Sequence, residues 1–167
     1  MPDHRPVARP VEGAPLKPRA QSASHTTMTE YVLPQHSNVL GGVFGGQIMA
    51  WVDLCAAICA QRHSGHQAVT AFIDDLKFHK PVRVGEVVRL VATVSATFRT
   101  SIEILVEVTG EDSRTGRTWP CVRALTVFVA IDALGRPTPV PPLLLDADDV
   151  RASQAAGEAR RRERLAR

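Results

Sequence analysis

The chain has 167 residues, of which 44% are hydrophobic and 22% charged, and this composition is typical of one globular domain. A domain of this length buries about 68–70% of the surface of its unfolded chain, so its stability requires neither a disulfide nor a metal. The net charge of +3 arises from Lys and Arg in residues 1–25 and 158–167, and the slightly acidic body between them argues against a nucleic-acid-binding core.

No export or membrane segment is expected. Residues 1–27 contain five prolines and no apolar run, which predicts a disordered arm. The longest nearly apolar stretch, residues 43–60, is shorter than the about 20 residues of a membrane span. Three cysteines in no paired spacing indicate a reducing compartment, so we expect a cytoplasmic protein.

The first regular elements after the arm are a short strand and a long helix. Residues 30–33 predict the strand, which Pro34 ends. Residues 45–63 contain no proline and carry apolar residues on almost every helical face, which predicts a helix enclosed by protein on all sides and closed by Gly65.

Downstream of the helix the apolar period changes to two. The alternating runs predict four strands, over residues 68–79, 88–98, 102–108 and 119–131. Their short connections indicate antiparallel pairing, and the alternation slips at Asp74 and Asp75, where we expect a β-bulge.

These elements predict an α+β fold, a long curved antiparallel sheet of about five strands wrapped around one central helix. Residues 28–145 are expected to form this single domain, and residues 146–167 a charged C-terminal helix with acids first and arginines last. A homodimer with two sheets joined edge to edge would cover the open side.

Asp53 is the first candidate site residue, because it lies between Val52 and Leu54 in the apolar helix. A carboxylate in such surroundings is paired, neutralised or open to a cleft. We interpret it as a general base or nucleophile in an apolar pocket. A core aspartate satisfied by backbone hydrogen bonds is the structural alternative.

Gly45 and Gly46 open the same helix, where backbone N–H groups can stabilise the oxyanion that forms when an acyl carbonyl is attacked. Close packing or a turn also explains such a pair. Gly46 and Asp53 are separated by a rise of about 10 Å, too far to act together on one carbonyl within one chain. Asp53 is therefore expected to serve a carbonyl bound at the neighbouring subunit's helix. Asn38 in the preceding loop could join this cleft, although loop asparagines often form turns.

The run NVLGGVFGGQIMAWVD, from Asn38 to Asp53, resembles the N-x-x-G-x-x-x-G-G motif and following Asp of hotdog-fold acyl-CoA thioesterases of the cytosolic acyl-CoA hydrolase group. Residues 78–85, 99–103 and 128–137 resemble later strands of that family in the same order, and four motifs in order are more specific than any one of them.

The resemblance implies a hotdog fold and hydrolysis of acyl-CoA to a free acid and CoA without a metal or separate cofactor. It implies that Asp53 is the catalytic carboxylate, acting on water or directly on the carbonyl. It assigns the oxyanion contact to the Gly46 N–H, a substrate contact to Gly45, and the orientation of water or thioester to Asn38. The family takes the Asn and Asp of one site from different hotdog units, so we expect dimers, assembled as a trimer of dimers.

Arg99, Thr100 and Ser101 match a family segment near the CoA-binding region, although a hairpin turn explains them equally well. A non-catalytic hotdog protein that binds acyl-CoA is the alternative function. A hotdog dehydratase or hydratase would need an Asp and His pair, and the helix has no histidine before His63. Acyl chain length is not predicted, because pocket depth depends on side chains from two chains.

Overall fold

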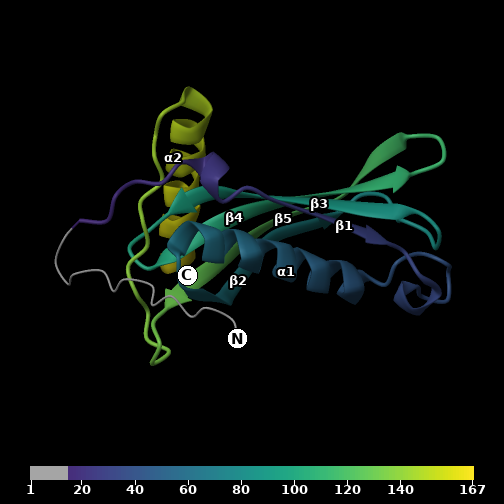
Figure 1. Ribbon diagram of the computed structural model, residues 1–167, viewed down its shortest axis with the longest axis horizontal. Coiled ribbons are helices and arrows are strands. Elements are labelled where there is room, and N and C mark those ends of the chain that lie inside the picture. The colour runs from purple at the N-terminus through teal and green to yellow at the C-terminus, as the bar shows by residue number, and fades with distance from the viewer. Residues whose placement is uncertain (1–14) are drawn as a thin grey trace, which may run out of the picture.

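The computed structural model describes residues 15–167, in which a five-stranded antiparallel sheet curves around a long helix (Figure 1). The strand order is β1-β3-β4-β5-β2, so β1 and β2 are the edge strands. The elements in chain order are η1 (Gln21–Ala23), β1 (Thr26–Tyr31), η2 (Pro34–His36), α1 (Gly45–Ser64), β2 (Gln67–Phe78), β3 (Val87–Thr97), β4 (Ser101–Asp112), β5 (Arg117–Ile131) and α2 (Asp148–Leu165).

The predicted α+β architecture is confirmed. Alternate residues of β3, such as Leu90 and Ala92, are fully buried in the core that also contains Cys55 and Cys59 of α1. The helix ends where the sequence predicts, because Gly65 adopts the left-handed conformation with a φ of 73°. The expectation that protein encloses α1 on all sides is wrong, since 52% of Leu54 is exposed.

The predicted β-bulge in β2 is confirmed. The pairing of β2 with β5 shifts register between Asp74 and Lys77, and Asp75 has a positive φ of 48°. A second register shift, between Thr70 and Phe72, has no counterpart in the prediction. Both irregularities lie in the edge strand, where β-bulges are common.

The folded domain begins earlier than the sequence predicts. Residues 1–14 of the predicted arm lie outside the described residues, but β1 starts at Thr26 rather than at residue 30. Arg19 donates hydrogen bonds from Nη1 to the carbonyl oxygens of Arg62 and His63, at 2.8 and 2.6 Å. The last carbonyl groups of α1 are thereby satisfied by a segment that its composition assigns to the arm.

The predicted C-terminal helix is present as α2, which crosses the sheet at the end where α1 finishes (Figure 1). It packs on the sheet face opposite to α1, because the side chain of Glu103 points away from those of Ile102 and Ile104 and contacts Arg160 of α2. Within residues 15–167, no helix combines the length and apolar character that a membrane crossing needs.

Candidate active site

The first turn of α1 carries two of the predicted site residues. Phe44 precedes the helix in an extended conformation and makes no side-chain cap. The amide groups of Gly45 and Gly46 are among the four N–H groups that a helix leaves without internal acceptors. Gly46 is exposed, so its amide lies at the protein surface with the partial positive charge of the helix N-terminus.

The ring of Phe44 lies directly over Gly46. A Cβ atom at position 46 would come within 2.7 Å of the Phe44 ring, so any larger residue would push the ring away. The Phe44 N–H donates to the carbonyl oxygen of His36, and the imidazole of His36 packs edge-on against Trp51 at 5.0 Å between ring centroids. The glycine turn is thus held by aromatic side chains on both sides of it in sequence.

Asp53 lies two turns further along α1, on the exposed face of the helix. It is half-buried, and Oδ1 accepts a hydrogen bond of 2.5 Å from the hydroxyl of Thr70 in β2. Within residues 15–167, Oδ2 accepts no hydrogen bond. The prediction that this carboxylate is buried in an apolar pocket is wrong for the single chain, where Asp53 is open to solvent.

Thr70 is a site residue that sequence reasoning did not identify. Its only signal was a polar residue between Val69 and Ala71 in an alternating strand, which is typical of any half-exposed strand. The contact with Asp53 joins residues 17 positions apart, and no local spacing predicts it.

Asn38 forms the turn that precedes α1. Its Oδ1 accepts hydrogen bonds from the backbone N–H groups of Leu40 and Gly42, at 2.9 and 3.3 Å, which is an Asx-type turn. The side chain is exposed, and its Nδ2 donates no hydrogen bond within the part of the chain that is described. The oxygen therefore shapes the loop, and the amide nitrogen remains available to a ligand.

Gly46 and Asp53 lie on the same face of α1. Seven residues turn a helix by almost two full turns, so the two positions align along the axis, about 10 Å apart. Met49 and Leu54 share this face and are 37% and 52% exposed. The structure thus brings Asn38, Gly45 and Gly46 together at one end of an open stripe and places Asp53 further along it.

Arg99, Thr100 and Ser101 lie at the other end of the sheet from the start of α1 (Figure 1). The carbonyl oxygens of Arg99 and Thr100 accept hydrogen bonds from Val140 and Ala130, so the segment is part of a backbone turn beside the end of β5. Within one chain the structure does not bring this segment to the glycine turn.

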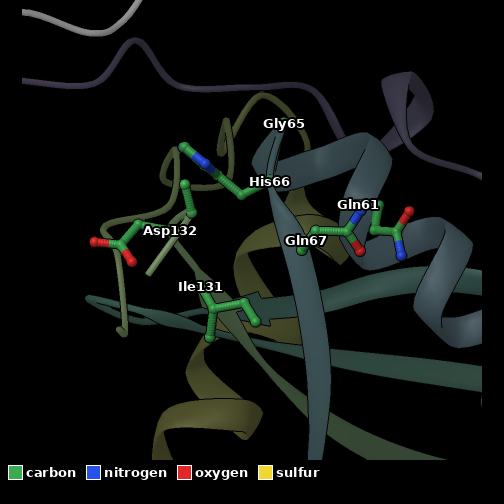
Figure 2. A pocket seen from close by; sticks show the side chains of 7 residues that line it. Gln61, Gly65, His66, Gln67, Ile131 and Asp132 are labelled. Carbon is green, nitrogen blue, oxygen red and sulfur yellow. The ribbon is translucent and has the colours of Figure 1, made fainter. Parts of the chain in front are cut away.

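A cavity of about 520 Å³ lies at the C-terminal end of α1, between Gly65 and the turn after β5. Figure 2 shows Gln61, His66 and Asp132 around it. None of the predicted site residues lines this cavity. It is therefore separate from the stripe that carries Gly46 and Asp53.

The cysteines are unsuitable as nucleophiles. All three are free and buried. Burial raises the pKa of the Cys55 and Cys121 thiols to about 11, and that of Cys59 to about 12. These thiols stay protonated at neutral pH and act as small core residues.

Residues 40–117 match the family described as the Thioesterase superfamily. An uncharacterised acyl-CoA thioester hydrolase of Bacillus subtilis strain 168 is 32% identical over 146 residues, which span 84% of this chain and 85% of that protein. Acyl-coenzyme A thioesterase 11 of Mus musculus is 36% identical over 110 residues, and the chain spans only 18% of its length.

Solved structures agree with these sequence matches. An acyl-CoA hydrolase from Staphylococcus aureus, in complex with butyryl coenzyme A, coenzyme A and coenzyme A disulfide, has a TM-score of 0.81 at 32% identity and covers 89% of this chain and 90% of its own. Variants of that hydrolase in which an aspartate, an asparagine or a threonine is replaced by alanine are also similar to the chain. An apo-hexameric acyl-CoA thioesterase has a TM-score of 0.85 at 32% identity, with coverage of 90% and 96%.

Proposed function

Because the chain belongs to the Thioesterase superfamily, among its hotdog-fold acyl-CoA hydrolases, we propose that it hydrolyses acyl-CoA thioesters at a site shared by two subunits. The products are a free carboxylic acid and CoA. The observation that carries this proposal is the exposed stripe of α1, which presents the Gly46 amide and the Asp53 carboxylate on one face, about 10 Å apart.

The chemistry follows from these groups. The N–H groups at the start of α1 hold the thioester carbonyl oxygen and stabilise the negative charge that it gains during attack. Asp53 takes a proton from water while the water oxygen bonds to the carbonyl carbon. The C–S bond then breaks, and the CoA sulfur leaves and is protonated. Direct attack by the Asp53 carboxylate would instead form a mixed anhydride, which water then hydrolyses.

Two subunits are needed because Gly46 and Asp53 of one chain cannot reach the same carbonyl. Strand β2 is an open edge with unpaired backbone groups and exposed apolar side chains, including Phe72 at 43% and Phe78 at 55%. Antiparallel pairing of β2 with the partner's β2 would set the two α1 helices side by side in opposite directions. The start of one α1 would then lie near the middle of the other.

The relatives support the substrate class and the assembly. The Staphylococcus aureus hydrolase binds butyryl coenzyme A and coenzyme A in its crystals, and a second relative is hexameric. We therefore propose an acyl-CoA substrate and a trimer of dimers for this chain. A cytoplasmic location agrees with three free cysteines and remains a prediction.

Replacing Asp53 by Asn tests the proposal, because the amide keeps the size of the side chain and loses the base. We expect release of free CoA thiol from butyryl-CoA and longer acyl-CoAs to fall by at least about a hundredfold. The control is Asp146→Asn, an exposed carboxylate next to α2. A protein that binds acyl-CoA but whose unaltered form releases no thiol from any chain length would instead be the non-catalytic binder.

A further inference from the structure

A second cavity, of about 260 Å³, lies at the end of the sheet where α1 begins. Its walls include three cations, Lys80, Arg83 and Arg117, together with the carboxylate of Glu86 and the indole of Trp119. Two segments far apart in sequence form it, the loop after β2 and the start of β5. The site described above uses none of these residues.

The indole of Trp119 is held in a defined position. Its Nε1 donates a hydrogen bond of 3.1 Å to the carbonyl oxygen of Pro81. A Cβ atom at Gly110 on β4 would be 2.5 Å from the ring, so the indole lies tightly against the glycine backbone. The guanidinium carbon of Arg117 lies 5.2 Å from the ring centroid. The cavity therefore contains a planar guanidinium beside a fixed aromatic ring.

The positive charge of this cavity is not neutralised by neighbouring acids. Lys80, Arg83 and Arg117 form no ion pair within residues 15–167. The Glu86 carboxylate accepts the Arg83 backbone N–H at 2.7 Å. Asp112, which pairs with Arg117 across the β4–β5 hairpin, contacts Arg114. Three cations face the cavity against one carboxylate, which suits a ligand with several negative charges.

The cavity is continuous with the loop that leads into α1. Arg83 forms a β-bridge with Gly42, and the Val43 N–H donates to the Val82 carbonyl oxygen at 2.8 Å. Gly45 follows only two residues after Val43. A ligand that occupies the cavity can therefore extend along this paired loop to the glycine turn of the same chain.

We propose that this cavity binds the phosphorylated adenine nucleotide end of acyl-CoA, an inference that rests on the function proposed above. That end of CoA combines a diphosphate and a 3′-phosphate with a planar purine. Arg83, Arg117 and Lys80 contact the phosphates, and the purine stacks on the guanidinium and indole planes. The site is distinct from Arg99–Ser101, which lies at the opposite end of the chain's sheet.

The test compares two substrates that share one thioester. Butyryl-CoA carries the nucleotide, and butyryl-pantetheine lacks it. For the double variant Arg83→Gln, Arg117→Gln we expect KM for butyryl-CoA to rise about tenfold, because two exposed charge-assisted contacts are lost. Its kcat, and both constants for butyryl-pantetheine, should stay within about twofold of those of the unaltered protein, since no pantetheine contact changes. The matched control is Arg89→Gln, an exposed arginine of β3 that does not line the cavity.

The outcomes separate this inference from the proposed function. An equal rise of KM for both substrates, or no rise for butyryl-CoA, would overturn the nucleotide site. Adenosine 3′,5′-bisphosphate should inhibit the unaltered protein competitively and the double variant about tenfold less. Non-competitive inhibition would assign the cavity to a free nucleotide and overturn the inference. If the unaltered protein hydrolyses neither substrate, the proposed function fails. Calorimetric binding of CoA and of pantetheine to the same variants then decides the cavity alone.

Discussion

The hydroxyl of Thr70 donates a hydrogen bond of 2.5 Å to the carboxylate of Asp53, which joins strand β2 to the middle of α1. Only Oδ1 is engaged in this way, so Oδ2 stays free to take a proton or to attack a carbonyl. Because β2 is also the open edge of the sheet, the same strand orients the carboxylate and offers the surface for a second subunit.

Thr70 is therefore expected to act as a positioning residue. Replacing Thr70 by Val keeps the shape of the side chain and removes the hydroxyl, so kcat for butyryl-CoA should fall about tenfold or more while KM stays unchanged. Thr70→Ser restores the donor and should recover most of kcat. Steady-state kinetics of the two variants check this. Equal losses in both variants would show that packing rather than the hydrogen bond matters.

The shared site predicts complementation between two inactive variants. Asn38→Ala and Asp53→Ala chains should each be inactive alone. When they are mixed under conditions that exchange subunits, half of the dimers are mixed, and each mixed dimer holds one intact site of two. About a quarter of the activity should return. Mass spectrometry of the mixture verifies exchange, and exchange without recovered activity would place both residues in one chain's site.

Glu103 is predicted to hold α2 on the sheet. It is fully buried, accepts hydrogen bonds from Arg160 at 2.6 Å and from Ser95 at 2.7 Å, and lies 3.4 Å from Arg164. Replacing Glu103 by Gln removes the charge that Arg160 and Arg164 face, and should lower the free energy of unfolding by about 3 kcal/mol at pH 7. Urea unfolding measures the loss. Glu107→Gln, an exposed position on the same strand, is the control and should change little.

The effect of Glu103 should depend on pH in one direction. Burial alone would raise the pKa of Glu103, but the hydrogen bonds from Arg160 and Ser95 and the nearby guanidinium charges lower it below its ordinary value. A carboxyl whose pKa is lower in the folded state stabilises the fold above the unfolded pKa of about 4.3. The difference between the unaltered protein and Glu103→Gln should therefore shrink as the pH falls below about 4. A constant difference down to pH 3 would contradict this origin.

Gly157 allows the close approach of α2 to β3. A Cβ atom there would lie 2.3 Å from the Cβ of Ala96 and 3.2 Å from Oε1 of Glu103. Gly157→Ala should lower the free energy of unfolding by about 1–3 kcal/mol through overpacking, although alanine favours a helix interior by about 1 kcal/mol. The double variant Gly157→Ala, Ala96→Gly removes the clashing methyl group and should recover part of the loss. A stabilised single variant would show that α2 is not held at this distance.

Sequence patterns predicted the elements that depend on near neighbours. The end of α1 at Gly65, the slip at Asp74 and Asp75 and the antiparallel strands all follow from residues a few positions apart. Composition alone was misleading for the N-terminal segment, because Arg19 is held by the carbonyl groups of residues more than 40 positions away. The motif from Asn38 to Asp53 indicated the family for the same local reason.

The sequence by itself determined the order of helix and strands, the glycine turn before the helix and the identity of the candidate carboxylate, because each is set by periodicity or by adjacent residues. Only the tertiary structure decided that Asp53 lies on an open stripe beside Thr70, and that Lys80, Arg117 and Trp119 share one cavity. These contacts arise from the register of strands and the curvature of the sheet around α1. Residue spacing along the chain carries no measure of either.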